Sequence, residues 1–266
     1  MYHYLFTVSS IITIIIDYTH REPYSLTMKR RIDVLLVERG LAESREKAQA
    51  LIMAGEVYID DVIAAKPSAQ VPEGSSIRLR EKLPFVSRGG IKLAHALSEF
   101  KIDVSSLIAA DVGASTGGFT DCLLQHGVSK VYAIDVGYGQ IDYRLRTDPR
   151  VVVIDRTNAR YPLPVPEQID IAAIDVSFIS LEKIVPNVAA ITKRGGRIIC
   201  LVKPQFEAGK SMVEKGGLVK NPAIHAGVLG RFISWSINKE YRIIGITPSP
   251  IYGSSGNREF FVLLRV

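Results

Sequence analysis

The sequence has little of what holds metal ions or disulfide frameworks. It contains only two cysteines, Cys122 and Cys200, which lie far apart, and five scattered histidines. None of them belongs to a CxxC, CxxH or HExxH spacing, so the sequence predicts no metal site and no disulfide framework. Because disulfides are rare in reducing compartments, we expect a cytoplasmic protein.

Long hydrophobic runs are also scarce. The only apolar run longer than a strand, residues 5–16, is too short to span a bilayer comfortably as a helix and lacks the flanks of a signal peptide. We therefore expect no membrane partner, with a membrane anchor in residues 1–27 as the alternative. Because a well-patterned domain begins directly after Met28, we predict that Met28 is the physiological start and that residues 1–27 are an extension.

Neither sign of charge is strongly in excess. Lys and Arg number 33 against 27 Asp and Glu, which gives a formal charge of +6. This modest excess favours a polyanionic partner, although it is also found in proteins that bind no nucleic acid. The length of 266 residues allows one large domain together with a small one.

The segment 28–81 predicts a small α+β domain. Apolar spacing suits a short helix that ends at Gly40, and Ser44 is placed to cap a second helix that ends at Gly55. Short strand-like pieces follow at residues 57–59, 62–63 and 76–79, joined by a turn at Asp60-Asp61. Two helices and a small strand set in about fifty residues bury little core.

This segment resembles the S4 RNA-binding domain. The resemblance rests on the patterns Arg31-x-Asp33-x-x-Leu36, Ser44-Arg45-x-x-Ala48 and Ile52-x-x-Gly55-x-Val57. In that family, the helices present basic side chains to folded RNA, where they neutralise phosphates. A solvated surface of mixed charge is the alternative, because residues 28–92 hold 12 basic and 9 acidic residues, a net of +3. By position, the residues expected to contact RNA are Lys29, Arg30, Arg31, Arg45 and Lys47.

Residues 82–86 look like a linker because Pro84 breaks the periodicity, and residues 87–266 predict an α/β domain. Apolar runs there alternate with helical patterns, which indicates a mostly parallel sheet covered on both faces. The expected strands are 108–112, 131–136, 151–154, 169–174, 197–202, 242–247 and 260–264. Seven strands, the last two forming a hairpin, resemble the Rossmann-like fold of class I methyltransferases.

A glycine-rich turn follows the first of these strands. Glycines at such a strand-to-helix turn let the backbone approach a ligand closely, and the helix start offers free N–H groups. Ser115 occupies the position of the second glycine in a dinucleotide-binding fingerprint. The spacing D-x-G-x-x-x-G-G-F instead resembles the first motif of S-adenosylmethionine methyltransferases. The predicted contacts to S-adenosyl-L-methionine in this turn are Asp111, Gly113, Ser115, Thr116, Gly117, Gly118 and Phe119.

Two further acidic residues follow strands. Asp135 ends the second strand, where a carboxylate can accept hydrogen bonds from both ribose hydroxyls of the cofactor. Asp155 and Asn158 follow the third strand, where class I methyltransferases contact adenine. The alternative for Asp155 is a cap or an ion pair with Arg156.

Charged residues are also expected where the ligand-binding edge of the sheet should lie. Asp175 and Lys203 end the fourth and fifth strands, Glu259 opens the last strand, and Lys92 on the preceding helix could reach the same edge. Burying a lysine is costly unless it is paired, so such a lysine is either functional or turned to solvent. Four such positions together favour function.

Over nearly all of its length after Met28, the sequence is similar to the TlyA family, in which an S4 domain precedes an FtsJ-like methyltransferase domain. The similarity includes the S4 pattern, the glycine-rich turn and the segments 87–93, 175–178 and 202–207. Family members methylate cytidine 2′-hydroxyls in ribosomal RNA, and many carry the label hemolysin.

The resemblance implies ribosomal RNA or ribosomal subunits as partners, and it adds Arg88 to the expected RNA contacts. It maps the catalytic tetrad of the family onto Lys92, Asp175, Lys203 and Glu259.

The predicted reaction needs a base, because a ribose hydroxyl is a poor nucleophile until its proton is drawn off. Lys203 is the candidate base, made neutral by a neighbouring cation such as Lys92 or the sulfonium. Asp175 and Glu259 would orient the lysines. Base amines are less suitable acceptors, since Val176-Ser177 replaces the prolines of the usual turn, and carbon-5 methylation would need a nucleophilic cysteine, whereas Cys200 lies inside a strand.

Two other classes of function stay open. A cytolysin would need a long hydrophobic span or alternating lipid-facing strands, and neither pattern is visible outside the apolar residues 5–16. A ribosome-binding protein without catalysis would keep the cofactor fold, and the intact set of two lysines and two acids argues against it.

Overall fold

The computed structural model describes residues 28–80 and 83–266. The predicted extension at residues 1–27 and the first residue of the predicted linker, Lys82, lie outside the described residues. The described residues form two compact units, 28–80 and 83–266, which are described separately.

The first unit is a small α+β fold. Helices α2 (Ile32–Glu38) and α3 (Arg45–Met53) pack on each other and on a three-stranded sheet with the order β3-β2-β5. Ser44 caps α3 by accepting a hydrogen bond from the Lys47 N–H at 3.2 Å, as its sequence position predicts. The strands of this sheet are β2 (Val57–Ile59), β3 (Val62–Ile63) and β5 (Ile77–Leu79).

The sequence did not predict the second sheet of this unit, which has two strands. Strand β1 (Lys29–Arg31) pairs antiparallel with β4 (Gln70–Pro72). The first three residues expected to contact RNA therefore lie on a strand rather than on a helix. Three-residue strands that pair across some forty residues leave no local alternation to detect.

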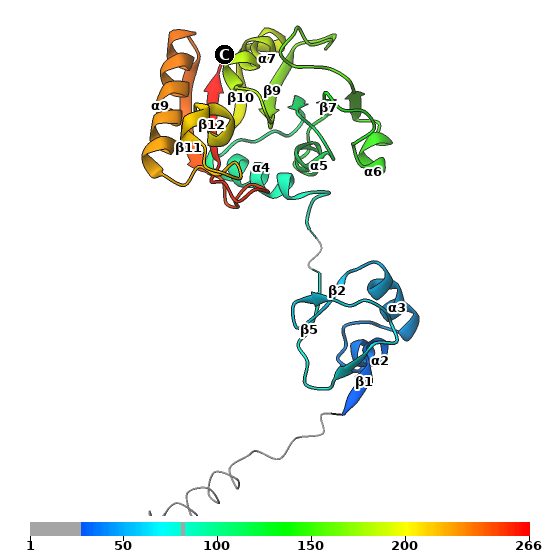
Figure 1. Ribbon diagram of the computed structural model, residues 1–266. Coiled ribbons are helices and arrows are strands. Elements are labelled where there is room, and N and C mark those ends of the chain that lie inside the picture. The colour runs from blue at the N-terminus through cyan, green and yellow to red at the C-terminus, as the bar shows by residue number, and fades with distance from the viewer. Residues whose placement is uncertain (1–27, 81–82) are drawn as a thin grey trace, which may run out of the picture. The chain divides into compact units, whose positions relative to one another are not determined.

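The second unit is built on one seven-stranded sheet (Figure 1), as predicted. Five strands are parallel, and β12 runs antiparallel between β10 and β11. The last two strands thus form the expected antiparallel pair. In spatial order the strands are β11 (Arg242–Pro248), β12 (Phe260–Arg265), β10 (Thr192–Val202), β9 (Ile169–Ile174), β6 (Ile108–Val112), β7 (Lys130–Ile134) and β8 (Val151–Ile154).

Two strand boundaries of this sheet differ from the prediction by more than one residue. Strand β7 ends at Ile134, two residues early, so Asp135 lies just beyond it. Strand β10 begins at Thr192, five residues before the expected start, and its register to β9 shifts between Thr192 and Arg197.

Both faces of the sheet are buried. Successive residues of β6, such as Ala109 and Ala110, point to opposite faces of the sheet and belong to different hydrophobic clusters. The first cluster includes side chains of α4 (Arg88–Glu99) and α5 (Gly118–Gln125), and the second includes those of α7 (Val185–Ile191) and α9 (Pro222–Asn238). This explains why the strands read as continuous apolar runs. The remaining short helices are α6 (Tyr143–Arg146), η1 (Leu181–Lys183), α8 (Pro204–Glu207) and η2 (Lys210–Met212).

Cys200 is fully buried inside β10, and burial raises the pKa of its thiol. A thiol in this state is a poor nucleophile, which agrees with the structural role expected for it. Among the helices of the described residues, none combines the length and apolar character that crossing a bilayer would require.

Candidate active site

The four side chains predicted to be catalytic line one cavity of about 390 Å³ in the second unit. Lys92 comes from α4, while Asp175 and Lys203 directly follow β9 and β10. Glu259 precedes β12, whose first residue, Phe260, lies opposite Val202 at the end of β10. Because β12 is antiparallel, its beginning meets the carboxyl ends of the parallel strands, so the four predicted catalytic residues gather at one edge of the sheet.

These residues form two ion pairs. Lys92 Nζ lies 2.5 Å from Glu259 Oε2, with the side chains only 10% and 3% exposed. Lys203 Nζ lies 2.5 Å from Asp175 Oδ1, with exposures of 12% and 21%. Pairing offsets the cost of desolvating each charge, so the cavity can keep two lysines close to a bound substrate.

Ser177 is a site residue that the sequence analysis did not identify. Lys203 Nζ donates a hydrogen bond to Ser177 Oγ at 3.0 Å, so this ammonium group has one charged and one neutral partner. The signal was present in the segment that begins at Asp175, where a serine replaces the second proline of the turn typical of amine methylation.

The glycine-rich turn lies against the catalytic edge. Gly113 and Gly117 have left-handed backbones, with φ of 90° and 95°. A Cβ at Gly113 would lie 2.3 Å from the carbonyl oxygen of Asp175. Only glycine allows this close approach, which joins the predicted cofactor turn directly to the catalytic segment.

The residues predicted to contact the cofactor divide between two cavities. The second cavity, of about 460 Å³, shares Gly113, Ser115 and Asp175 with the first. Gly117 lines neither cavity and instead caps α5. The predicted residues at the first cavity are Asp111, Gly113, Ser115, Thr116, Gly118 and Phe119, and those at the second are Gly113, Ser115, Asp135 and Asn158.

Asp135, which follows β7, is hydrogen-bonded to the glycine-rich turn that follows β6. Its Oδ2 accepts a hydrogen bond from the Ser115 N–H at 2.8 Å, and its Oδ1 accepts one from the Gly137 N–H at 2.6 Å. Each carboxylate oxygen has two lone pairs, so both can accept a further hydrogen bond from a ligand in the second cavity.

Asp155 lines neither cavity in the described chain. It forms an ion pair with Arg146 at 3.2 Å and accepts a hydrogen bond from the Gly139 N–H at 3.2 Å. The predicted partner was Arg156, but the Arg156 guanidinium lies over the Tyr138 ring, 4.4 Å from the ring centroid. Asp155 therefore forms an ion pair, as the alternative predicted, but with Arg146 instead of Arg156.

Asp111 has an unusual environment, because it is fully buried and borders the first cavity. Its Oδ2 accepts hydrogen bonds from the N–H and the hydroxyl of Thr120 at 2.8 and 2.7 Å. Its Oδ1 has no hydrogen-bond partner among the residues of the described chain. Burial is the main cause that raises the pKa of Asp111 to about 7. An unpartnered carboxylate oxygen suits a ligand that carries hydrogen-bond donors or positive charge.

We expect the wild-type protein to lose stability relative to an Asp111→Asn variant as the pH rises from about 5 to about 7. The pKa of Asp111 is about 7 in the folded protein against 3.8 for the ordinary group. Between these values the folded state keeps a proton that the unfolded state has lost, so the free energy of unfolding falls with rising pH. The change is about 2 kcal/mol, or about 5 °C in melting temperature.

Thermal unfolding of both proteins across this pH range measures the difference, and Asp103→Asn is the control, since Asp103 is exposed and its pKa is lowered. Parallel curves for the wild type and the Asp111→Asn variant would contradict the expectation.

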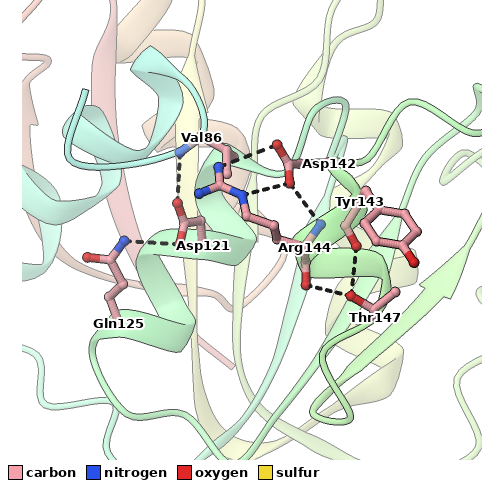
Figure 2. Close-up of polar contacts among 7 residues, drawn as sticks. All are labelled: Val86, Asp121, Gln125, Asp142, Tyr143, Arg144 and Thr147. Atoms are coloured by element: carbon pink, nitrogen blue, oxygen red, sulfur yellow. Dashed lines mark hydrogen bonds and ion pairs between the residues drawn. The ribbon is translucent and has the colours of Figure 1, made fainter. Parts of the chain in front are cut away.

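The start of α5 is fastened to the segment before α4 (Figure 2). Asp121, in the first turn of α5, accepts hydrogen bonds from the Val86 N–H at 2.7 Å and from Gln125 Nε2 at 3.0 Å. Gln125 also donates to the carbonyl oxygen of Pro84 at 3.0 Å. These contacts hold residues 84–86 on α5 and bring Ser87 and Gly89 to the wall of the first cavity.

In the first unit, the structure brings two of the predicted RNA contacts together. The guanidinium groups of Arg31 and Arg45 donate to Asp33 Oδ2 at 2.8 and 3.1 Å, and Gln49 Nε2 donates to the same oxygen at 2.9 Å. Asp33 is fully buried, and the hydrogen bond from Arg31 is the main cause that holds the pKa of its carboxyl far below the usual range. One carboxylate thus fixes two half-exposed arginines.

The other predicted RNA contacts are not gathered in this way. Arg30 pairs with Glu38 at 2.6 Å, and Lys47 lies 4.0 Å from Glu43. Lys29 is exposed on β1. Arg88 belongs to the second unit, where it lines the first cavity and donates to the Tyr252 carbonyl oxygen at 2.8 Å.

No group of three or more histidine, cysteine, aspartate or glutamate side chains in the described part of the chain could hold a metal ion. At the cavity, two lysines are paired with two carboxylates, an arrangement that can stabilise charge and exchange a proton.

Comparisons with known proteins agree with this architecture. The sequence-family model of the FtsJ-like methyltransferases matches residues 85–266, and the sequence-family model of the S4 domain matches residues 30–77. The chain is 49% identical to the provisionally named rRNA methyltransferase YqxC of Bacillus subtilis, over 89% of this chain and 85% of the relative. It is 42% identical to the 16S/23S rRNA (cytidine-2′-O)-methyltransferase TlyA of Mycobacterium tuberculosis, over 90% and 91%.

A solved structure from Streptococcus thermophilus, provisionally named a hemolysin, is similar with a TM-score of 0.69 and 42% identity, over 90% of this chain and 89% of the other. The matched segments include the whole cavity and the arginine pair on Asp33. The chain belongs to the TlyA family, in which an S4 domain is joined to an FtsJ-like methyltransferase domain.

Proposed function

We propose that this methyltransferase transfers the methyl group of S-adenosyl-L-methionine to the 2′-hydroxyl of cytidine in ribosomal RNA. The observation that carries the proposal is that two lysine–carboxylate pairs and the glycine-rich turn line the same cavity. The relative TlyA of Mycobacterium tuberculosis is named for this activity and is 42% identical.

The cofactor supplies an electrophilic methyl group when it is bound. Its binding would use the backbone of the glycine-rich turn, the free oxygen of Asp111 and the carboxylate of Asp135. The unpartnered Asp111 Oδ1 fits a ligand that carries an ammonium group and a sulfonium. Asp155, which is held by Arg146 outside both cavities, would act by shaping the loop rather than by direct contact.

Lys203 is the proposed general base. It can accept a proton from the ribose hydroxyl only in its neutral form. Lys92 lines the same cavity. Asp175 and Ser177 hold the Lys203 amine in place at 2.5 and 3.0 Å, so its lone pair can be directed at the substrate.

Glu259 orients Lys92 by the second ion pair. With both lysines fixed, the site can hold the hydroxyl in line with the methyl group, and such positioning supplies much of the acceleration in bimolecular displacements.

The first unit, which matches the S4 domain, would bind RNA by contacting the phosphates of the RNA. Arg31 and Arg45, held together on Asp33, present two guanidinium groups that remain about 40% and 53% exposed. Contacts of this kind give affinity with little reading of sequence, and they weaken as salt rises. Lys29 on the first strand would add to this interaction, and Arg88 would contact RNA at the cavity of the second unit.

The decisive experiment incubates the purified full chain with ribosomal RNA or ribosomal subunits and S-adenosylmethionine labelled in its methyl group. We expect label in 2′-O-methylcytidine after digestion of the RNA to nucleosides. Label in a base-methylated nucleoside would contradict the choice of oxygen as acceptor. Absence of transfer to every RNA and subunit would contradict the whole proposal and favour a ribosome-binding role without catalysis.

A further inference from the structure

Two segments leave the sheet next to each other at the catalytic edge. The first, residues 175–181, follows β9, and the second, residues 203–207, follows β10, its parallel neighbour. They touch at their beginnings through the Lys203–Asp175 ion pair. Further along, the rings of Phe178 and Phe206 lie 4.8 Å apart.

Glu207 joins the far ends of the two segments. It is the last residue of α8, and its Oε1 accepts a hydrogen bond from the Leu181 N–H at 2.8 Å. Its carbonyl oxygen accepts one from Arg231 of α9 at 3.0 Å. Burial raises the pKa of the Glu207 carboxyl, while the Leu181 N–H and the Ser180 side chain act against that shift. A partly buried carboxylate is thus aimed at the backbone of the neighbouring loop.

The loop that Glu207 holds is strained. Phe178 has a left-handed backbone with φ of 63°, which is unfavourable for a bulky residue, and its side chain is 90% exposed. Such a conformation persists only where the surroundings fix it on both sides. On one side the loop is fixed at Asp175 and Ser177 by Lys203, and on the other side it is fixed at Leu181 by Glu207.

We propose that Glu207 is a positioning residue for methyl transfer, which fixes the segment that carries Asp175 against the segment that carries Lys203. Glu207 does not line the catalytic cavity. It lines a separate cavity of about 180 Å³ together with Glu182 and Arg231. The inference rests on the proposed function for its effect on the reaction, whereas its effect on the loop is measured without any substrate.

Two readouts test the proposal on the full chain. The first is hydrogen–deuterium exchange of the free protein, followed in peptides that cover residues 176–184. We expect Glu207→Ala to exchange at least about 10-fold faster there, because the Leu181 N–H loses its acceptor, and peptides of the glycine-rich turn to stay unchanged. Glu207→Gln keeps an oxygen that can accept from Leu181, so it should exchange like the wild type.

The second readout is steady-state kinetics. Glu207→Ala should lower kcat about 10- to 100-fold, the size expected for displacement of catalytic groups by about 1 Å, with KM for RNA and Kd for S-adenosylmethionine within about 3-fold of the wild type. Glu207→Gln should recover most of kcat. Glu182→Ala is the matched control, since this exposed carboxylate lines the same small cavity and should leave both readouts unchanged.

Unchanged exchange of residues 176–184 in Glu207→Ala would overturn the proposal, and so would wild-type kcat in that variant or equal losses in kcat, KM and Kd. If the alanine variant does not fold, Glu207→Asp replaces it, because it keeps the charge and withdraws the carboxylate from Leu181 by one methylene. Its exchange and kcat should lie between the wild type and a full loss, and wild-type values would overturn the proposal. A wild-type protein that methylates no RNA contradicts the proposed function alone, and the exchange result still decides whether Glu207 holds the loop.

Discussion

Replacing Lys203 by alanine is expected to lower kcat for methyl transfer by about 10³-fold, within the range of general base catalysis, while Kd for S-adenosylmethionine stays within about 3-fold. The Lys203 amine is the group held between Asp175 and Ser177 at the cavity wall, with only 12% of the side chain exposed. Its removal takes away the proton acceptor and leaves Asp175 without its ion pair.

Lys203→Arg separates these two effects. Arginine can keep an ion pair with Asp175, but its guanidinium does not lose a proton in proteins. If Lys203 is the base, the arginine variant is therefore almost as inactive as the alanine variant. Substantial activity in Lys203→Arg would show that the side chain acts as a fixed positive charge instead.

The matched control is Lys193→Ala. Lys193 lies on the same strand, β10, and pairs with Asp170 at 2.6 Å, but it does so near the beginning of the strand and away from the cavity. We expect its loss to leave kcat unchanged. Single-turnover rates and cofactor binding by calorimetry, measured on all three variants, give the comparison. A Lys203→Ala variant with full activity would remove the assignment of the base.

Gly113→Ala is expected to weaken cofactor binding by about 30-fold or more, because the new methyl group has no space and overpacking of this kind costs roughly 1–3 kcal/mol. Its Cβ would lie 2.3 Å from the Asp175 carbonyl oxygen, which is backbone and cannot turn aside. Either the glycine-rich turn or the catalytic segment has to move, so kcat should fall together with affinity.

Gly216→Ala is the control for backbone strain alone. Gly216 has the same φ of 90° as Gly113, but a Cβ there meets nothing within 4 Å. Calorimetric titration with S-adenosylmethionine should therefore show a large loss of affinity for Gly113→Ala and almost none for Gly216→Ala. Equal affinities in the two variants would mean that contact with Asp175 is unimportant for the cofactor site.

The two halves of the fold differed in how well they could be predicted. In the second unit, continuous apolar runs flanked by glycine-rich or charged turns gave strands that mostly agree with the structure within one residue. In the first unit, β1 and β4 were missed because β1 consists only of basic residues and β4 ends in a proline, so neither shows an apolar period. The long start of β10 was missed for another reason, because residues 193–197 are only basic residues and glycines and the register to β9 shifts there.

The sequence by itself determined that Asp175, Lys203 and Glu259 would meet. Consecutive parallel strands end at one edge, and an antiparallel strand begins there, so residues at those positions share the edge wherever the side chains point. The glycine-rich turn was determined in the same way, since its spacing has a local cause in the left-handed residues Gly113 and Gly117.

Only the tertiary structure decided which charges pair and which groups are left without a partner. Lys92 and Glu259 are 167 positions apart, and Glu207 reaches Leu181 across 26 positions. The free oxygen of Asp111 and the joint hold of Asp33 on two arginines are likewise invisible in the sequence. The physical reason is that pairing and desolvation depend on distances of a few ångströms between side chains from different elements, and these distances are set by packing of the core rather than by any local pattern.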